Sequence, residues 1–244
     1  MVYLPMHSKA GKQFVIECSH VVAAIHTSHG LKSALRLPPG AVDLLEIRLD
    51  ALVQMEGGMR ALVKTLPKLK IPLLITARDP KEGGIGSLTL AQRRELLQAA
   101  LPFASLLDLE LRNAAALKDV REAARAAGVG VVLSAHDFAK TPSLARLEAM
   151  KKKAATFKPA VFKFAGLAKT TEDLSVLLAF LTREKKLPLA VMGMGPWGKL
   201  SRLTLGAAGS VLNYGFLDEA NATGQWPARL LKERLREVVV PKGF

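Results

Sequence analysis

Short apolar runs rich in β-branched residues alternate with longer segments of helical periodicity along most of this chain. Eight such runs lie at residues 21–26, 42–48, 71–76, 105–110, 129–134, 159–164, 188–192 and 210–213. Between them, apolar residues recur every three or four positions, which predicts amphipathic helices. The clearest lie at 52–66, 90–101, 114–127, 144–155, 171–183 and 227–238. A strand followed by a helix, repeated eight times, predicts an α/β fold in which a parallel sheet closes into a (β/α)8 TIM barrel.

The chain is large enough for one such barrel. It has 244 residues, of which 50% are hydrophobic, and no Pro-, Gly- or Ser-rich linker divides it. We therefore expect a single barrel domain over residues 1–244. An open doubly wound sheet is the alternative, but no Gly-rich phosphate-binding motif follows the first run. Residues 13–17 resemble an extra strand, and we expect this N-terminal strand or hairpin to cap the bottom of the barrel.

Charged and polar residues gather where the predicted strands end. In barrels of this kind the active site lies at the C-terminal ends of the strands. Side chains two positions apart on a strand point the same way, so charges placed there must pair or bind something if they face the interior. The residues concerned are Glu46, Arg48, Asp50, Arg78, Glu82, Asp108, Glu110, His136, Lys163, Met192 and the loop at 219–225.

Lys163 stands alone in the apolar run 160–165, and His136 follows the preceding run, 27 positions earlier. That spacing fits one βαβ repeat, so both side chains are expected at the same end of neighbouring parallel strands. A lysine in an apolar wall loses hydration of its ammonium, which lowers its pKa and favours reaction as a nucleophile. The alternatives are a lysine that extends from a strand end to water and a hydrogen-bonded core histidine.

The chain carries 35 Lys and Arg against 21 Asp and Glu, a formal charge of +14. Such a balance suggests nucleic acid or another anionic partner. The charges are spread over many helical segments, however, and only 5% of residues are aromatic, which leaves little for base stacking. We therefore expect no nucleic-acid partner, and the excess charge could instead attract a small anionic substrate.

Cys18 is the only cysteine, so an internal disulfide is excluded and the chain suits a reducing compartment. The N-terminal residues lack the pattern of a signal peptide, and no apolar run is long enough to span a membrane. These features favour a cytoplasmic protein with no membrane partner. The histidines at positions 7, 20, 26 and 29 show no ligand-like pairing, so no metal is expected.

Seven segments in one order resemble the motifs of type I 3-dehydroquinate dehydratases, the Schiff-base enzymes of the shikimate pathway. They are 46–50 (EIRLD), 76–84 (TARDPKEGG), 108–110 (DLE), 134–142 (SAHDFAKTP), 163–165 (KFA), 192–202 (MGMGPWGKLSR) and the pair 209–210 (GS) with 224–225 (GQ). Each segment alone is weak. Their common order and the spacing from His136 to Lys163 make the resemblance specific.

The resemblance implies a lyase that needs neither cofactor nor metal and acts as a homodimer on a small anionic substrate. It implies that Lys163 forms the Schiff base, that His136 is the general acid and base, and that Glu82 orients His136. It implies that the substrate carboxylate is held by Arg202, Asn221 and Gln225. It implies that the ring hydroxyls of the substrate are bound, and the local charge is tuned, by Glu46, Arg48 and Arg78. Asp50, Asp108 and Glu110 receive no assigned role.

The chain departs from the family in its last loop, which reads NATGQ at 221–225 where the family has SAPGQ. Asn221 replaces a serine that contacts substrate, and Thr223 replaces a proline. A class I aldolase is the rival Schiff-base enzyme, but it would not need Arg202 or the Gly224–Gln225 pair. A non-catalytic binder of acidic partners is the rival outside enzymes.

Overall fold

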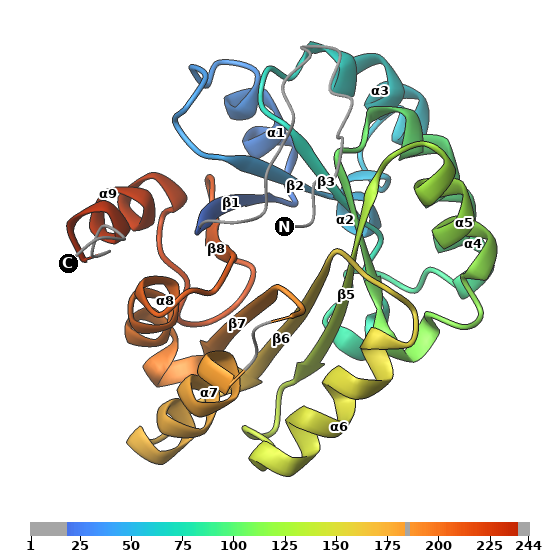
Figure 1. The fold of residues 1–244 in the computed structure, drawn as a ribbon. Helices are drawn as coiled ribbons and strands as arrows, with labels where there is room; N and C mark the ends of the chain where they lie inside the picture. The colour runs from blue at the N-terminus through green and yellow to red at the C-terminus, as the bar shows by residue number, and fades with distance from the viewer. Residues whose placement is uncertain (1–18, 184–185, 239–244) are drawn as a thin grey trace.

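The computed structural model describes residues 19–183 and 186–238. Within them the chain forms one parallel sheet of eight strands, surrounded by helices (Figure 1). The strands follow the order β7-β6-β5-β4-β3-β2-β1-β8. Their bounds are β1 (His20–Ile25), β2 (Leu44–Arg48), β3 (Leu73–Thr76), β4 (Leu106–Glu110), β5 (Gly130–Asp137), β6 (Val161–Leu167), β7 (Leu189–Met194) and β8 (Leu212–Phe216). The prediction of a (β/α)8 barrel is confirmed.

The barrel is nearly closed, because β7 and β8 stand at the two ends of the strand order. At the N-terminal end of the strands this seam is bridged by two contacts. The backbone N–H of Val211 donates to Leu189 O at 2.9 Å, and that of Val191 donates to Ser210 Oγ at 3.0 Å. Backbone pairing does not continue upward into a ladder between the two strands.

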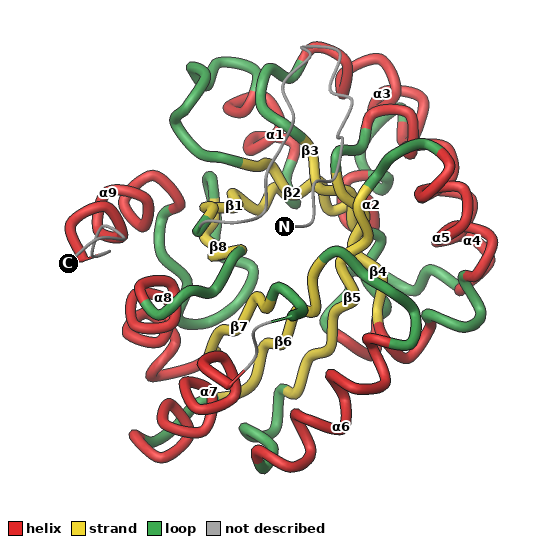
Figure 2. The backbone as a smooth tube through the Cα atoms, viewed as in Figure 1, coloured by secondary structure: helices red, strands yellow, loops and turns green. Residues whose placement is uncertain are grey.

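The helices pack on the outside of the sheet, as the ribbon and tube views show (Figures 1 and 2). Their bounds are α1 (Ser28–Ala34), α2 (Leu49–Leu52), α3 (Gly58–Thr65), α4 (Leu90–Ala100), α5 (Lys118–Ala126), α6 (Leu144–Ala155), α7 (Thr171–Arg183), α8 (Gly198–Ala207) and α9 (Ala228–Val238). Short 3₁₀ turns join them: η1 (Leu66–Lys68), η2 (Pro80–Glu82), η3 (Leu101–Phe103), η4 (Leu111–Asn113) and η5 (Gly195–Trp197).

The helix predictions agree best where the periodic pattern is uninterrupted. The ranges predicted at 144–155 and 171–183 are those observed for α6 and α7. The helix predicted at 52–66 is wrong, because the chain forms α2 and then α3. Gly57 just before α3 and Gly58 at its first position take positive φ angles of 80° and 46°, which a continuous right-handed helix does not permit. Helices α1 and α8 were not among the clearest predictions.

The strands carrying the predicted site extend further than their apolar runs. Strand β5 continues to Asp137 and β6 to Leu167, because later polar and small residues stay in the ladder. Lys163 therefore lies inside its strand and is paired in register with Ser134, while His136 is paired with Ala165. His136 is one inward-facing step above Lys163 and not level with it.

An apolar layer fills the barrel below the site. It consists of Val22, Leu44, Leu74, Leu106, Val132, Val161, Ala190 and Leu212, which are all fully buried. The residues two positions later on the same strands face the same interior, one step higher. Those residues are Ala24, Glu46, Thr76, Asp108, Ser134, Lys163, Met192 and Tyr214. The apolar layer therefore seals one end of the barrel, and the polar layer above it forms the bottom of the site.

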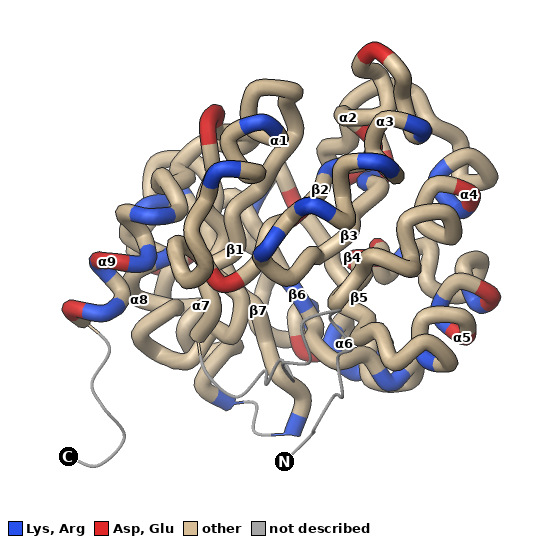
Figure 3. Tube along the Cα trace, turned by 90° about the horizontal axis from the view of Figure 1, so that it is seen from above, with Lys and Arg blue, Asp and Glu red and all other residues tan. Residues whose placement is uncertain are grey.

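The predicted strand or hairpin at 13–17 and Cys18 lie outside the described residues. In the part of the chain that the structure covers, no helix is both long enough and apolar enough to cross a membrane. Lys and Arg residues lie on many separate elements around the molecule (Figure 3).

Candidate active site

A cavity of about 100 Å³ lies above the polar layer. All nine side chains predicted for the site line this cavity: Lys163, His136, Glu82, Glu46, Arg48, Arg78, Arg202, Asn221 and Gln225. They come from four strands or their following turns, from α8 and from the loop after β8. The remaining lining residues are Gly83, Phe138, Ala165, Met192, Met194, Tyr214 and Ala222.

Lys163 is buried in this cavity, with 4% of its surface exposed. Its Nζ lies 3.0 Å from Asp108 Oδ2 and 4.0 Å from Glu46 Oε1. Burial lowers the pKa of Lys163, and the charges of Asp108 and Glu46 oppose that effect. The net shift is downward, so a neutral amine is easier to form here than on a surface lysine.

Asp108 holds two buried cations of the site, Arg78 and Lys163, together. Its Oδ2 lies 2.9 Å from Arg78 Nη2 and 3.0 Å from Lys163 Nζ, and its Oδ1 accepts a hydrogen bond from Ser134 Oγ at 2.5 Å. Burial alone would raise the pKa of Asp108. The charges of Arg78 and Lys163 outweigh burial and hold the pKa well below its usual range. Asp108 is therefore an anion throughout the working pH range.

Arg78 is surrounded by carboxylates and has little capacity left for a ligand. It lies 2.9 Å from Asp108, 3.2 Å from Glu110 and 3.9 Å from Glu46, and Nη1 also donates to Ser134 Oγ at 2.6 Å. Burial would lower the pKa of Arg78, but Asp108 and Glu110 raise it well above its usual value. We expect Arg78 to act mainly by fixing the acidic groups around Lys163.

A second arginine, which sequence reasoning missed, supports this network from outside the barrel. Arg93 of α4 is buried and bridges Asp79 Oδ2 at 2.8 Å and Glu110 Oε2 at 3.0 Å. The signal was present in the sequence, because Arg93, Leu97 and Ala100 share one buried helix face. A charge on the apolar stripe of a helix implies a buried partner.

Arg48 and Asp50 form a bidentate ion pair. Arg48 Nε and Nη2 donate to the two Asp50 carboxylate oxygens at 3.0 and 2.7 Å. Asp50 also accepts from the backbone N–H groups of Arg78 and Ile85. Burial would raise the pKa of Asp50, but the hydrogen bond and the charge of Arg48 lower it. Asp50 thus fixes Arg48 and the chain after β3, which gives it a structural role.

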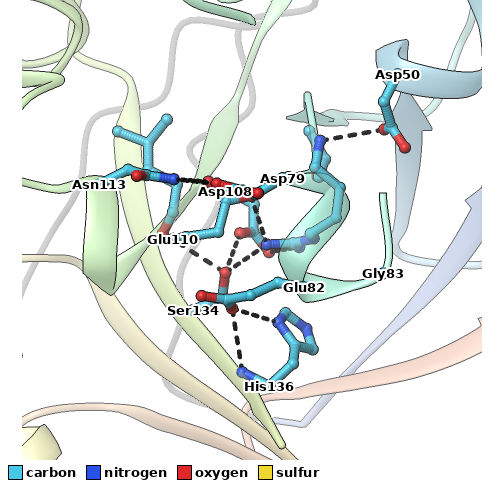
Figure 4. A network of polar contacts seen from close by, with 12 residues as sticks. Asp50, Asp79, Glu82, Gly83, Asp108, Glu110, Asn113, Ser134 and His136 are labelled. Carbon is cyan, nitrogen blue, oxygen red and sulfur yellow. Dashed lines mark hydrogen bonds and ion pairs between the residues drawn. The ribbon is translucent and has the colours of Figure 1, made fainter. Parts of the chain in front are cut away.

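Glu82 and His136 lie in contact with each other in the cavity (Figure 4). His136 Nδ1 lies 3.0 Å from Glu82 Oε2, which also accepts from the backbone N–H of His136 at 3.2 Å. Burial raises the pKa of Glu82 to about 7. Burial and the charges of Arg78 and Lys163 lower the pKa of His136 well below its usual value. Glu82 and His136 thus face each other with pKa values shifted in opposite directions, that of the acid upward and that of the imidazole downward.

Arg202 of α8 is fully buried, and its contacts join three parts of the chain. Nε donates to Tyr214 O at 2.9 Å, and Nη1 donates to the carbonyls of Gly193, Gly198 and Gly224 at 2.7 to 2.9 Å. Since Gly193 is in β7 and Tyr214 in β8, Arg202 bridges the upper part of the barrel seam.

No carboxylate within the described ranges balances the charge of Arg202. Burial alone lowers its pKa to about 10, so it stays charged at neutral pH. Nη2 makes none of the hydrogen bonds above, and the side chain lines the cavity. A buried cation without an acidic partner is costly, and an anion in the cavity would compensate for it.

The loop after β8 is organised by Gln225. Its Oε1 accepts from the backbone N–H groups of Asn221 and Ala222 at 3.0 and 3.3 Å. The Oε1 atom of Gln225 is thus occupied, and its Nε2 group is left to donate to a ligand. Asn221 lines the cavity as well, and Gly224 O accepts from Arg202. The loop is therefore attached to the side of the cavity that Arg202 lines.

Two further lining residues received no role from sequence reasoning, although Phe138 lies within one of the family motifs. Tyr214 was not singled out, although it stands two positions after Leu212 of the apolar layer, where five of the other seven strands carry a polar residue. Phe138 follows β5 and stacks on the His136 ring, with ring centres 6.2 Å apart. Across the described chain, no three His, Cys, Asp or Glu residues are grouped so that they could hold a metal ion.

The comparisons with known proteins point to one family. A family model described as type I 3-dehydroquinase matches residues 21–239. A 3-dehydroquinate dehydratase from Klebsiella pneumoniae subsp. pneumoniae is 35% identical over 223 residues, covering 84% of each protein. One from Thermodesulfovibrio yellowstonii is 32% identical over 183 residues, covering 75% of this chain and 80% of the relative. The crystal structure of 3-dehydroquinate dehydratase from Geobacillus kaustophilus HTA426 superposes with a TM-score of 0.81 at 28% identity, covering 90% of each chain.

Proposed function

The chain belongs to the type I 3-dehydroquinase family, and we propose that it dehydrates 3-dehydroquinate to 3-dehydroshikimate through a Schiff base on Lys163. The observation that carries the proposal is the grouping of three features around one cavity. These are a buried lysine with a lowered pKa, a histidine paired with a glutamate, and an arginine without an acidic partner. They match the ketone, the acidic proton and the carboxylate of the substrate.

The first step is imine formation. The Lys163 ammonium first passes one proton to His136, and the lone pair of the neutral Nζ then attacks the ketone carbon. One of the remaining Nζ protons moves to the carbonyl oxygen to give a carbinolamine. That hydroxyl takes the proton held by His136 and leaves as water, and a protonated imine remains on Nζ. Asp108, at 3.0 Å from Nζ, stabilises the positive charge of this iminium.

The second step is elimination. His136 removes the proton next to the imine carbon, and the electron pair of the broken C–H bond moves into the iminium to give an enamine. The enamine then expels the hydroxyl group on the β carbon, which takes the proton back from His136 and leaves as water. Water hydrolyses the conjugated imine, which releases the product and restores Lys163. One group serves as base and acid in succession, so the net change is the loss of one water.

Substrate positioning is proposed for the remaining residues. Arg202 Nη2 would bind the carboxylate with Gln225 Nε2 and the Asn221 side chain, where charge and donors converge. Glu46 Oε1 accepts from Thr76 Oγ1, which leaves Oε2 available for a ring hydroxyl. Arg48 and Arg78 would tune the charge of the cavity around Glu46. Arg48 lines the cavity beside Gly83, whose carbonyl it also contacts.

The proposal is tested by trapping the imine. 3-Dehydroquinate should produce the absorbance of a conjugated product, and borohydride added during turnover should raise the intact mass by one reduced ligand. Peptide mapping should place that ligand on Lys163. Lys163→Ala should lose both the label and nearly all turnover. Lys169→Ala, which changes an exposed lysine just after β6, should lose neither. Turnover with no change in mass under borohydride would overturn the imine mechanism.

Homodimer formation and a cytoplasmic location remain predictions from the family resemblance. Light scattering coupled to size exclusion would test the first, because a dimer has twice the 26.2 kDa mass of the chain.

A further inference from the structure

Tyr214 lies directly beneath the reacting amine. It is the third residue of β8, is 3% exposed and lines the cavity. Lys163 Nζ lies over the face of its ring, 3.9 Å from the ring centre. The negative face of an aromatic ring attracts a cation in this geometry. The ring and Asp108 therefore hold Nζ between them.

The hydroxyl of Tyr214 is buried and has no hydrogen-bond partner among the described residues. Six buried side-chain atoms there lack a partner, and the other five belong to His26, Arg93, Arg94, Glu148 and Asp218. Each of those five side chains carries at least one further polar atom, and none of them lines the cavity. Tyr214 differs from these five, because its hydroxyl is the only polar group of its side chain and has no partner among the described residues.

An unpaired buried hydroxyl destabilises the protein, and phenylalanine would fill the same space without that penalty. Natural proteins keep such violations mainly at functional sites. The hydroxyl is also a permanent donor in this setting. Burial and the nearby carboxylates of Glu46 and Asp108 raise the pKa of Tyr214 well above its usual value, so it does not ionise at working pH.

We infer that Tyr214 is a positioning residue for imine formation, with a hydroxyl that gains its partner only when substrate is bound. The inference rests on the Schiff-base mechanism proposed above. The ring holds Lys163 Nζ in place as the resting ammonium and later as the iminium, so the neutral amine that forms between these states is already oriented for attack. The hydroxyl donates to the substrate oxygen beside Nζ, which is the ketone oxygen.

This contact strengthens as the carbinolamine forms. When Nζ attacks, the electron pair of the carbonyl moves onto that oxygen, and a preorganised neutral donor stabilises the developing charge. Tyr214 keeps its proton throughout. The proton that leaves with the water comes from His136, which is then free to act as the base of the elimination.

The test compares Tyr214→Phe with the wild type. Removing an unpaired hydroxyl should raise the melting temperature of the ligand-free enzyme by about 2–4 °C. The single-turnover rate of borohydride trapping should fall about tenfold, and kcat/KM should fall with it. KM should change less, because the contact strengthens mainly after binding.

The matched control is Ser210→Ala, which removes a buried hydroxyl whose bonds are made. Ser210 Oγ accepts from the backbone N–H of Val191 at the N-terminal end of the barrel seam. This variant should lower the melting temperature and leave trapping unchanged. Tyr214→Leu removes the ring as well, so the half-point of trapping should move to lower pH as the Lys163 ammonium loses support.

Two results would overturn the inference: wild-type trapping kinetics in Tyr214→Phe, or a fall in its melting temperature, which would show that the hydroxyl is already bonded. Failure of the wild type itself to trap substrate would instead overturn the proposed mechanism, so the two failures are distinguishable.

Discussion

One carboxylate oxygen of Glu82 holds His136 at two points, the ring Nδ1 at 3.0 Å and the backbone N–H at 3.2 Å. The double contact fixes the ring relative to its own strand. When Glu82 is ionised, it accepts a hydrogen bond from Nδ1–H. The proton stays on Nδ1, and the lone pair of Nε2 is left for the substrate. The geometry thus selects the tautomer that can act as a base.

We predict that kcat/KM falls about tenfold per pH unit below about pH 7, the pKa of Glu82. Below this pH the pair takes up one proton. On His136 the proton makes an imidazolium; on Glu82 it makes an acid that donates to Nδ1 and moves the ring proton to Nε2. Either way Nε2 has no lone pair, so activity is present above pH 7 and lost as pH falls. Initial rates across the range measure this limb.

Glu82→Gln is the control for this acidic limb of the pH profile of kcat/KM. The amide oxygen can still accept from both nitrogen atoms of His136, but it does not titrate. The remaining limb belongs to His136, whose pKa lies well below its usual value, so the loss of activity should shift to lower pH. A limb that stays near pH 7 in this variant would assign it to another group.

Asp108→Asn should make the protein less stable and Lys163 more reactive at low pH. Arg78 would lose one of the three carboxylates that balance it, at a cost of about 3–5 kcal/mol in unfolding free energy. Lys163 would lose the charge that favours its ammonium, so the half-point of borohydride trapping should move down in pH. Urea unfolding and a trapping titration give the two readings. Asp119→Asn changes a half-exposed carboxylate in an ion pair and should alter stability by less than about 1 kcal/mol.

Arg202→Lys should impair both binding and folding. One ammonium cannot replace the guanidinium donors that reach four carbonyls, so we expect a loss of about 1–3 kcal/mol in unfolding free energy. The loss of the two-pronged donor should raise KM by a similar free energy. Arg121→Lys, on a partly buried arginine that bonds Ala114 O away from the cavity, is the matched control. A wild-type KM in Arg202→Lys would remove this arginine from the substrate site.

Gly224→Ala should displace the last loop from the site. Gly224 has φ +78°, and an added Cβ would meet Gly195 O at 2.5 Å and Gly198 Cα at 2.7 Å. The loop must then move away from Arg202, so KM should rise and stability should fall by more than about 1–2 kcal/mol. Gly40→Ala separates the effect of backbone strain from that of the steric clash. Gly40 has φ +84°, but an added Cβ there would have open space around it. That control should show the backbone strain alone, with an unchanged KM.

Restoring the family pattern with Asn221→Ser and Thr223→Pro should keep kcat/KM within about tenfold. The Thr223 carbonyl accepts from the backbone N–H of Gly195, and proline retains that carbonyl. The loop at 218–226 is expected to close over ligand, so its amide hydrogens should exchange more slowly with product bound. Equal exchange with and without product would argue against closure.

The sequence was sufficient for the barrel because hydrophobic periodicity reports directly on local structure. It grouped the side chains that line the cavity for a related reason. Each polar residue that follows an apolar strand residue by two positions must face the same interior, as Leu44 and Glu46 or Val161 and Lys163 do. Strand ends were harder to predict, since the polar residues of the site continue the β5 and β6 ladders beyond their apolar cores.

What the sequence could not give was the pairing between distant segments. Asp108 had no assigned role, yet it joins Arg78 to Lys163 across three strands. Arg202 was predicted to contact substrate, but nothing in its neighbouring residues predicts bonds to carbonyls on β7, β8 and the last loop. Such contacts depend on how strands are ordered around the barrel, and they emerge only in three dimensions.

Arg202 bridges the β7–β8 seam and also lines the cavity that we propose as the active site. Elsewhere around the barrel, backbone ladders set the spacing between strands, and a ligand cannot change it. At this seam the spacing depends on a charged side chain that also faces the cavity. A carboxylate bound to Arg202 would therefore act on the side chain that joins the upper parts of β7 and β8, so we expect occupancy of the site to reduce the mobility of these two strands.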